Sequence, residues 1–90
     1  MALKRLRKLP ASFHSTDMDG ELVMIHGDTG QFFALKDVGL RIWNALDDEA
    51  DLNAITAILQ REYAVDPDTC HKSVEDFANQ LVEVGFAEFY

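Results

Sequence analysis

The spacing of apolar residues changes once along the chain, at Lys36. Before Lys36, short apolar runs are separated by the sequences DMDG and GDTG, whose residues tolerate positive φ or cap their own turn backbone. After Lys36, apolar residues recur about every 3.6 residues, which is the period of a helix. The pattern predicts an α+β fold in which a meander of three antiparallel strands (SFHST, ELVMIH and QFFALK) is followed by three helices.

Capping residues delimit the predicted helices. Asp37 is expected to cap the first, Asp51 the second and Asp66 the third. Pro67 then occupies the first position of the third helix, and Gly85 is placed to end it. Its apolar face comprises Cys70, Val74, Phe77, Ala78, Leu81 and Val82. The terminal FAEFY is expected to be an extended tail that packs or pairs locally.

The composition suits one globular domain, which we take as residues 1–90. Hydrophobic residues make up 48% of the chain and charged residues 27%. Half of the basic residues lie near the N-terminus, at Lys4, Arg5, Arg7 and Lys8, so residues 1–10 are expected to form a flexible basic arm. The formal net charge is −8. An acidic body repels phosphate groups, and nucleic acid is therefore not an expected partner.

Cysteine content and hydropathy favour a cytoplasmic protein. Cys70 is the single cysteine, so no disulfide can form within the chain. No apolar run of signal-peptide or membrane-spanning length follows the basic N-terminus. We therefore expect no membrane partner.

No group of residues in the sequence forms a recognisable catalytic or metal-binding motif. His14, His26 and His71 are scattered, and neither an HExxH sequence nor a paired-cysteine zinc signature occurs. Cys70 and His71 are adjacent on a predicted helix, so their side chains diverge and cannot act as a nucleophile and its base. GDTG lacks the Lys and hydroxyl residue of a phosphate-binding loop. We expect no enzyme activity, no metal and no cofactor.

The predicted third strand is apolar on both faces. Phe33 and Leu35 point to one side of it, and Phe32 and Ala34 point to the other. As the last strand of a meander it has one neighbour, which leaves its outer N–H and C=O groups unpaired. No Pro, Lys or bulge signal blunts this edge from Gln31 to Leu35. Either the tail or a partner must cover it, and Phe32 packs under the tail, under the third helix, or against a bound chain.

Sequence motifs in this order resemble the PqqD-like family, which comprises the precursor-peptide recognition elements of ribosomal peptide natural-product pathways. The motifs are DGELVMIHGDTGQFFALKDVGLRIWNAL, then YAVDP, then a long helix ending in LVEVGF. The resemblance extends from about Phe13 to Phe86. Lys36 departs from the family pattern, since many members have Asn before the first helix, and we expect a local change in capping there.

The resemblance implies a winged helix-turn-helix variant that binds peptide in place of DNA. In this family, the leader of a precursor peptide adds as a strand antiparallel to the third strand, in the groove between that strand and the third helix. The implied peptide-binding residues in this chain are Gln31, Phe32, Phe33, Ala34, Leu35, Ser73, Val74, Phe77, Ala78 and Leu81.

The implied function is that of a non-catalytic module that captures the leader and delivers the precursor to a modifying enzyme. In this family such enzymes include the leader peptidases and cyclases of lasso-peptide pathways and radical S-adenosylmethionine enzymes, and the sequence does not choose among them. The alternative function is that of a DNA-binding winged-helix regulator that reads DNA with the third helix. The predicted outward residues of that helix are net acidic, which disfavours this alternative: Lys72, Glu75, Asp76, Asn79 and Glu83.

Overall fold

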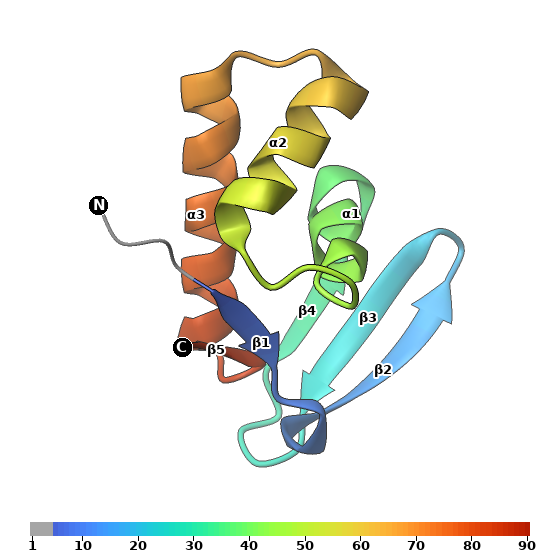
Figure 1. The fold of residues 1–90 in the computed structure, drawn as a ribbon. Coiled ribbons are helices and arrows are strands. Elements are labelled where there is room, and N and C mark those ends of the chain that lie inside the picture. The colour runs from blue at the N-terminus through green and yellow to red at the C-terminus, as the bar shows by residue number, and fades with distance from the viewer. Residues whose placement is uncertain (1–4) are drawn as a thin grey trace.

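Two antiparallel sheets and three helices make up the computed structural model, which describes residues 5–90 (Figure 1). The elements in chain order are β1 (Leu6–Lys8), a 3-10 turn (Pro10–Ser12), β2 (Phe13–Met18), β3 (Glu21–His26), β4 (Phe32–Leu35), α1 (Asp37–Ala45), α2 (Leu52–Tyr63), α3 (Pro67–Glu83) and β5 (Ala87–Phe89). The three-stranded sheet β2–β3–β4 followed by three helices confirms the predicted α+β class. The second sheet, β1–β5, has two strands.

β3 is the central strand of the larger sheet. It pairs with β2 from Phe13↔His26 to Met18↔Glu21, and it pairs with β4 over four residue pairs. Because side chains alternate along a strand, Met24 of β3 and Phe33 of β4, which lie opposite each other, both face the helices. The other face of the sheet is not covered by a helix (Figure 1).

An aromatic cluster joins this sheet to the end of α3. Phe86 is fully buried at its centre. The ring of Phe13 lies 5.6 Å from that of Phe86 and 5.5 Å from that of Trp43, both edge to face. The rings of His26 and Phe33 lie 5.9 Å and 6.1 Å from the ring of Phe86. Edge-to-face aromatic pairs add to the stability gained by burial, so this cluster holds the sheet against the helices.

Two of the three predicted helix caps are confirmed. Asp51 accepts a hydrogen bond from the N–H of Asn53 at 2.8 Å, and Asp66 accepts one from the N–H of Thr69 at 3.1 Å. The predicted end of α3 is also confirmed. Gly85, with φ of +86°, follows the helix and turns the chain away from its axis.

The cap predicted for α1 is wrong. The N–H of Leu40 donates to the carbonyl oxygen of Lys36 at 3.3 Å, which makes Lys36 the N-cap residue. A lysine side chain has no acceptor, and Lys36 makes no side-chain cap bond. Asp37 instead lies inside the first turn with φ of +52°. The helix therefore begins without a side-chain cap, which is the local change expected at Lys36.

Residues 6–8 belong to the fold, in contrast to the flexible arm expected over residues 1–10. They form β1, which pairs with β5, and the side chain of Leu6 is fully buried. The ammonium group of Lys8 lies 4.3 Å from the centre of the Trp43 ring and 2.7 Å from Oδ1 of Asp47. The sequence did not predict this strand because β1 contains one apolar residue and two adjacent basic ones, which give no alternating pattern. The part of the predicted basic arm that precedes Arg5 lies outside the residues that the structure describes.

We predict that Leu6→Ala lowers the free energy of unfolding by about 2–5 kcal/mol, because it removes a fully buried side chain. Urea denaturation followed by circular dichroism measures this change. Arg7→Ala is the matched control in the same strand, since its side chain is exposed, and we expect it to cost less than about 1 kcal/mol. Equal, small effects of both substitutions would show that β1 is not part of the cooperative fold.

Candidate functional site

β4 is an edge strand. Among residues 5–90 it pairs with β3 alone, because β5, the strand that could have covered it, pairs with β1. Figure 1 shows β4 on the side of the sheet that faces α3, with β2 on the far side. A chain that added to β4 would therefore lie between the sheet and a helix, whereas a chain added to β2 would have no second wall.

The free backbone groups of β4 belong to Phe32 and Ala34. The N–H of His26 donates to the carbonyl oxygen of Gln31 at 2.8 Å, next to the turn. Hydrogen-bonded and non-hydrogen-bonded pairs alternate in an antiparallel ladder. Phe33 and Leu35 therefore direct their N–H and C=O groups at β3, and Phe32 and Ala34 direct theirs at the open edge.

The two faces of β4 differ in burial. Leu35 is 3% exposed and Phe33 is half-buried against the core, whereas Phe32 is 73% exposed. Phe32 therefore packs neither under the tail nor under α3. Its cross-strand neighbour Ile25 is also exposed, at 47%. One face of the strand is thus part of the core, and the other presents an aromatic side chain beside the unpaired edge.

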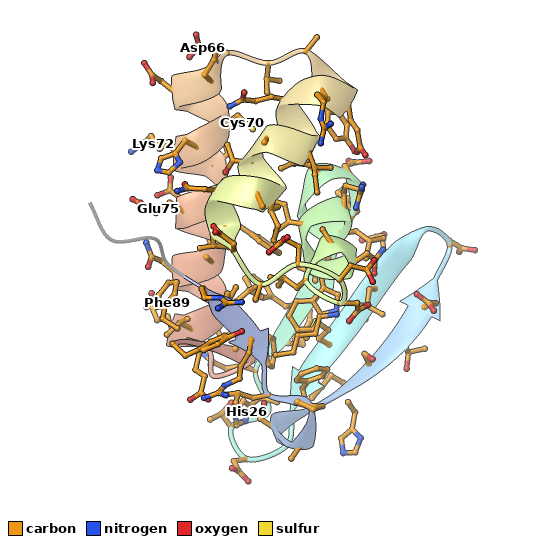
Figure 2. All side chains as sticks on the ribbon, in the orientation of Figure 1. His26, Asp66, Cys70, Lys72, Glu75 and Phe89 are labelled. Atoms are coloured by element: carbon orange, nitrogen blue, oxygen red, sulfur yellow. The ribbon has the colours of Figure 1, made fainter. Side chains whose placement is uncertain are left out.

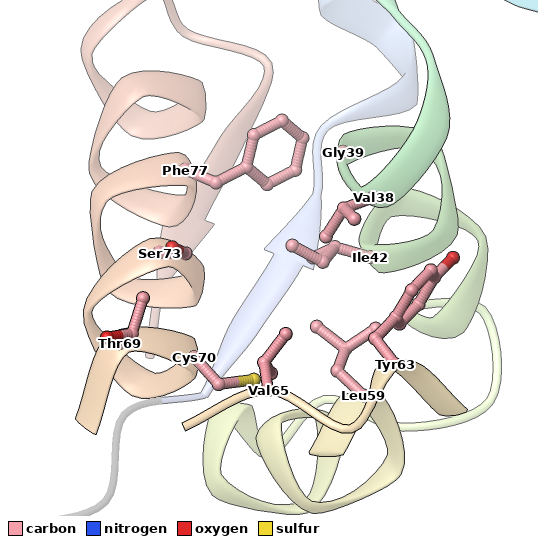
Figure 3. Close-up of a pocket in the computed structure, with 10 residues that line it drawn as sticks. All are labelled: Val38, Gly39, Ile42, Leu59, Tyr63, Val65, Thr69, Cys70, Ser73 and Phe77. Carbon is pink, nitrogen blue, oxygen red and sulfur yellow. The ribbon is translucent and has the colours of Figure 1, made fainter. Parts of the chain in front are cut away.

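A cavity of about 330 Å³ lies between α1, α2 and α3 (Figure 3). Its lining consists of Val38, Gly39, Ile42, Leu59, Tyr63, Val65, Thr69, Cys70, Ser73 and Phe77. None of these side chains is charged, and the hydroxyl groups of Tyr63, Thr69 and Ser73 are the polar groups that the lining side chains supply besides the Cys70 thiol. In Figure 3 the Phe77 ring projects from α3 towards Gly39. A Cβ atom at Gly39 would lie 3.3 Å from that ring, so the glycine permits this close approach.

The connection between α2 and α3 shapes one wall of the cavity. Ala64 ends α2 in the left-handed conformation, with φ of +51°. The residues on either side of it, Tyr63 and Val65, both line the cavity and are 43% and 41% exposed. Large apolar surface is therefore accessible to solvent at this wall.

An ion pair joins α1 to α2 next to Tyr63. The Arg41 guanidinium donates from Nε and Nη2 to the two carboxylate oxygens of Glu62, at 2.9 Å and 2.8 Å. This hydrogen bonding lowers the pKa of Glu62 and raises the pKa of Arg41. The bidentate geometry links α1 to α2 at this point, and because both side chains are partly exposed its contribution to stability is small.

Cys70 lies in the cavity wall as a buried apolar residue. It is 5% exposed, and its Sγ lies 3.7 Å from the carbonyl oxygen of Thr56. Burial raises the pKa of the Cys70 thiol, which keeps it protonated at neutral pH. This agrees with its expected role as a small core residue and not as a nucleophile.

The ten predicted site residues separate into three groups. Val74, Ala78 and Leu81 are at most 1% exposed and belong to the core. Ser73 and Phe77 line the cavity. The remaining five lie in or next to β4, where Gln31 precedes the strand that was expected to begin with it.

Most of the cavity lining was missed from the sequence. Val38, Leu59 and Val65 come from three separate segments and have the residue types of ordinary core positions. No local spacing distinguishes a residue that lines a cavity from one that fills the core. Their convergence depends on the left-handed turn at Ala64, which has no glycine to mark it.

The outward face of α3 is net acidic. Figure 2 shows Lys72 and Glu75 on the side of the helix away from Cys70. Lys72 is followed on the exposed surface by Asp76 and Glu83, which repel phosphate groups. Within residues 5–90, no cluster of His, Cys, Asp or Glu could hold a metal ion. In the same range, no helix has the length and apolar character needed to cross a membrane.

The comparisons with known proteins agree on one family and fold. The model of the family described as coenzyme PQQ synthesis protein D (PqqD) matches residues 21–87. A structure of TbiB1 in complex with the TbiA(beta) leader peptide is 32% identical, covers 93% of this chain and 98% of that chain, and superposes with a TM-score of 0.80. A search of curated proteins finds no match.

A second solved structure supports the fold alone. It is a lasso peptide synthetase B1 complexed with the leader peptide, and it is 23% identical to this chain. The alignment covers 93% of this chain and 98% of that chain, with a TM-score of 0.81.

We predict that Glu62→Gln destabilises the protein at neutral pH and that this difference shrinks in acid. Because the folded-state pKa of Glu62 is lowered, the ion pair stabilises the fold above the ordinary Glu pKa of about 4.3, and this stabilisation is lost as the pH falls through the lower folded-state value. Urea denaturation of both proteins at pH 7 and at about pH 3 measures the difference. Glu83→Gln, at an exposed position of α3, is the control. If Glu62→Gln changed the free energy of unfolding equally at both pH values, the ion pair between Glu62 and Arg41 would not be the cause of the change.

Proposed function

Because this chain belongs to the family of coenzyme PQQ synthesis protein D (PqqD), we propose that it is a non-catalytic module that binds the leader of a ribosomally made precursor peptide. The leader adds to β4 as a further strand. The observation that carries this proposal is the unpaired edge of β4 on the side of the sheet that faces α3. The similarity to TbiB1, a protein solved in complex with a leader peptide, supports it.

Strand addition alone gives a weak complex. Phe32 and Ala34 offer two N–H and two C=O groups, so about four new hydrogen bonds contribute roughly 2–6 kcal/mol net. Ordering a flexible leader costs roughly 2–5 kcal/mol, which offsets most of this gain. Backbone pairing therefore sets the geometry and direction of the leader, and side-chain contacts must provide the affinity.

Apolar side chains of the leader supply the remaining free energy. Each that becomes fully buried contributes roughly 1.5–3 kcal/mol. Three of them near the upper end of this range bring the affinity to the micromolar range, which corresponds to about −8 kcal/mol. Phe33 and Phe77 are partly exposed on the facing walls and are the candidate contacts. Phe32, on the outer face, contacts side chains that the leader directs to that face.

The bound leader leaves the rest of the precursor free for chemistry by another protein. No catalytic group of this chain takes part in the proposal. The partner is a modifying enzyme of the pathway, such as a leader peptidase, a cyclase or a radical S-adenosylmethionine enzyme, which receives the precursor in a fixed orientation.

Polarisation titrations of fluorescently labelled leader peptides, taken from precursors encoded beside the gene, test this function. We predict micromolar or tighter binding by the wild-type protein and at least a tenfold loss in Ala34→Pro. Proline removes one of the N–H groups at the open edge and places a ring where the leader would lie, while the bonds to β3 remain.

Ser15→Pro is the matched control on the opposite edge of the same sheet. The alternation of bonds along β2 also directs the N–H of Ser15 outward, so the substitution has the same chemistry at the other edge. We expect wild-type affinity in this variant and native circular dichroism in both. Wild-type affinity in folded Ala34→Pro would exclude strand addition at β4.

A further inference from the structure

His26 holds the loop that joins β3 to β4 through both its backbone and its side chain. Its N–H donates to the carbonyl oxygen of Gln31 at 2.8 Å, and its carbonyl oxygen accepts from the N–H of Gly30 at 3.0 Å. Its ring nitrogen Nδ1 accepts from the N–H groups of Asp28 and Thr29, at 3.1 Å and 3.3 Å. The conformation of the loop therefore depends on this one residue.

A threonine hydroxyl group connects the imidazole of His26 to the start of β4. The N–H of Thr29 donates to the imidazole, and Oγ1 of Thr29 accepts from the N–H of Gln31 at 3.2 Å. Gln31 immediately precedes Phe32, whose N–H and C=O groups are the first that face the open edge. The hydrogen bonds thus run from the imidazole, through Thr29, to the residue next to the open edge.

The ring of His26 also contacts the segment that ends α3. It stacks on the ring of Phe86, with the centroids 5.9 Å apart and an angle of 22° between the planes. A Cβ atom at Gly85 would lie 2.9 Å from Nε2 of His26, so the glycine leaves room for the imidazole. Figure 2 shows His26 at the end of the sheet from which the loop extends. One side chain therefore links the loop before β4 to the end of α3.

The acceptor atom and the stacking surface are separate parts of the His26 side chain. Because Nδ1 accepts from two backbone N–H groups, the proton of the neutral ring lies on Nε2. Asparagine retains an acceptor, since its Oδ1 is bonded to Cγ as Nδ1 is in histidine, but it has no ring. Phenylalanine retains a ring and has no acceptor. Substitutions can therefore remove either part and keep the other.

We propose that His26 is a positioning residue for peptide binding. Through Nδ1 and Thr29 it fixes the loop at residues 27–30, and it thereby holds the start of β4 in the conformation that pairs with the leader. The inference rests on the proposed function and adds to it a residue that acts through Thr29 and Gln31 and not by touching the leader. Stability depends mainly on the stacked ring, whereas leader affinity depends on the acceptor. A side chain needed only for packing would show no such separation.

Two substitutions of His26 test this separation, with polarisation of the labelled leader and urea denaturation as the measurements. We expect His26→Phe to unfold at or above the wild-type urea midpoint and to bind the leader about fivefold or more weakly, because the acceptor is lost. We expect His26→Asn to have a lower urea midpoint and an affinity within about twofold of the wild type, because it keeps an acceptor. Wild-type affinity in folded His26→Phe, or a loss in His26→Asn as large as that in His26→Phe, would overturn the proposal.

A matched pair of substitutions at Thr29 tests the second link. Valine has nearly the shape of threonine and keeps the backbone N–H, but it has no oxygen to accept from the N–H of Gln31. Serine keeps the hydroxyl group. We expect leader affinity to fall about threefold or more in Thr29→Val and to stay within about twofold of the wild type in Thr29→Ser. Equal affinities of the two variants would overturn the connection through Thr29.

Hydrogen exchange in the absence of the leader separates this inference from the proposed function. We expect the amides of Thr29 and Gln31, measured by NMR, to exchange roughly tenfold faster in His26→Phe than in the wild type, because the loop opens more often. In His26→Asn we expect rates close to those of the wild type. Unchanged exchange at both amides in His26→Phe would overturn the proposal. The expected exchange pattern combined with no binding of any leader by the wild-type protein would instead contradict the proposed function.

Discussion

The pairing of β5 with β1 decides which surface this protein can offer to a partner. The last strand of the chain could in principle have extended the larger sheet, but its backbone groups are committed to the N-terminal segment. The N–H of Tyr90 donates to the carbonyl oxygen of Arg5 at 2.9 Å, and β1 is held on its other side by a bond from the N–H of Leu6 to Ala50. The guanidinium of Arg7 lies 4.6 Å from the centre of the Tyr90 ring and adds to this attachment. β4 remains an edge strand because the C-terminal strand β5 pairs with β1 and not with β4.

The adjacent residues Phe32 and Phe33 of β4 have different surroundings because successive side chains of a strand point to opposite faces of the sheet. Phe33 lies 6.1 Å from Phe86 and fastens the edge strand to the core, so the edge is held in place before any peptide arrives. Phe32 exposes its aromatic ring to solvent beside the exposed Ile25, so both side chains are accessible to a bound peptide. Preorganisation of this kind lowers the entropy lost on binding, because only the peptide has to be ordered.

Local chemistry accounts for what could be predicted from the sequence. The strands, the turns and the helix ends at Asp51, Asp66 and Gly85 follow from residues that act on their own neighbours in the chain. The N-cap of α1 was mispredicted by one residue. The first helical hydrogen bond is accepted by the carbonyl oxygen of Lys36, so Asp37 is the first residue of the helix and not its cap. β1 was missed because its single apolar residue is buried by a strand eighty residues away, and no local pattern encodes such a pairing. The cavity was missed for the same reason, since its walls converge from separate helices and from the left-handed turn at Ala64.

Hydrogen exchange at the amides of β4, measured by NMR with and without the leader peptide, tests strand addition most directly. Phe32 and Ala34 direct their N–H groups at the open edge, whereas Phe33 and Leu35 already bond to β3. Binding at this edge slows exchange at Phe32 and Ala34 by a large factor and has a smaller effect on Phe33 and Leu35. Unchanged exchange at Phe32 and Ala34 in the presence of saturating leader, or new protection at Ser15 and Asp17 on the opposite edge, would contradict the assignment of β4 as the binding strand.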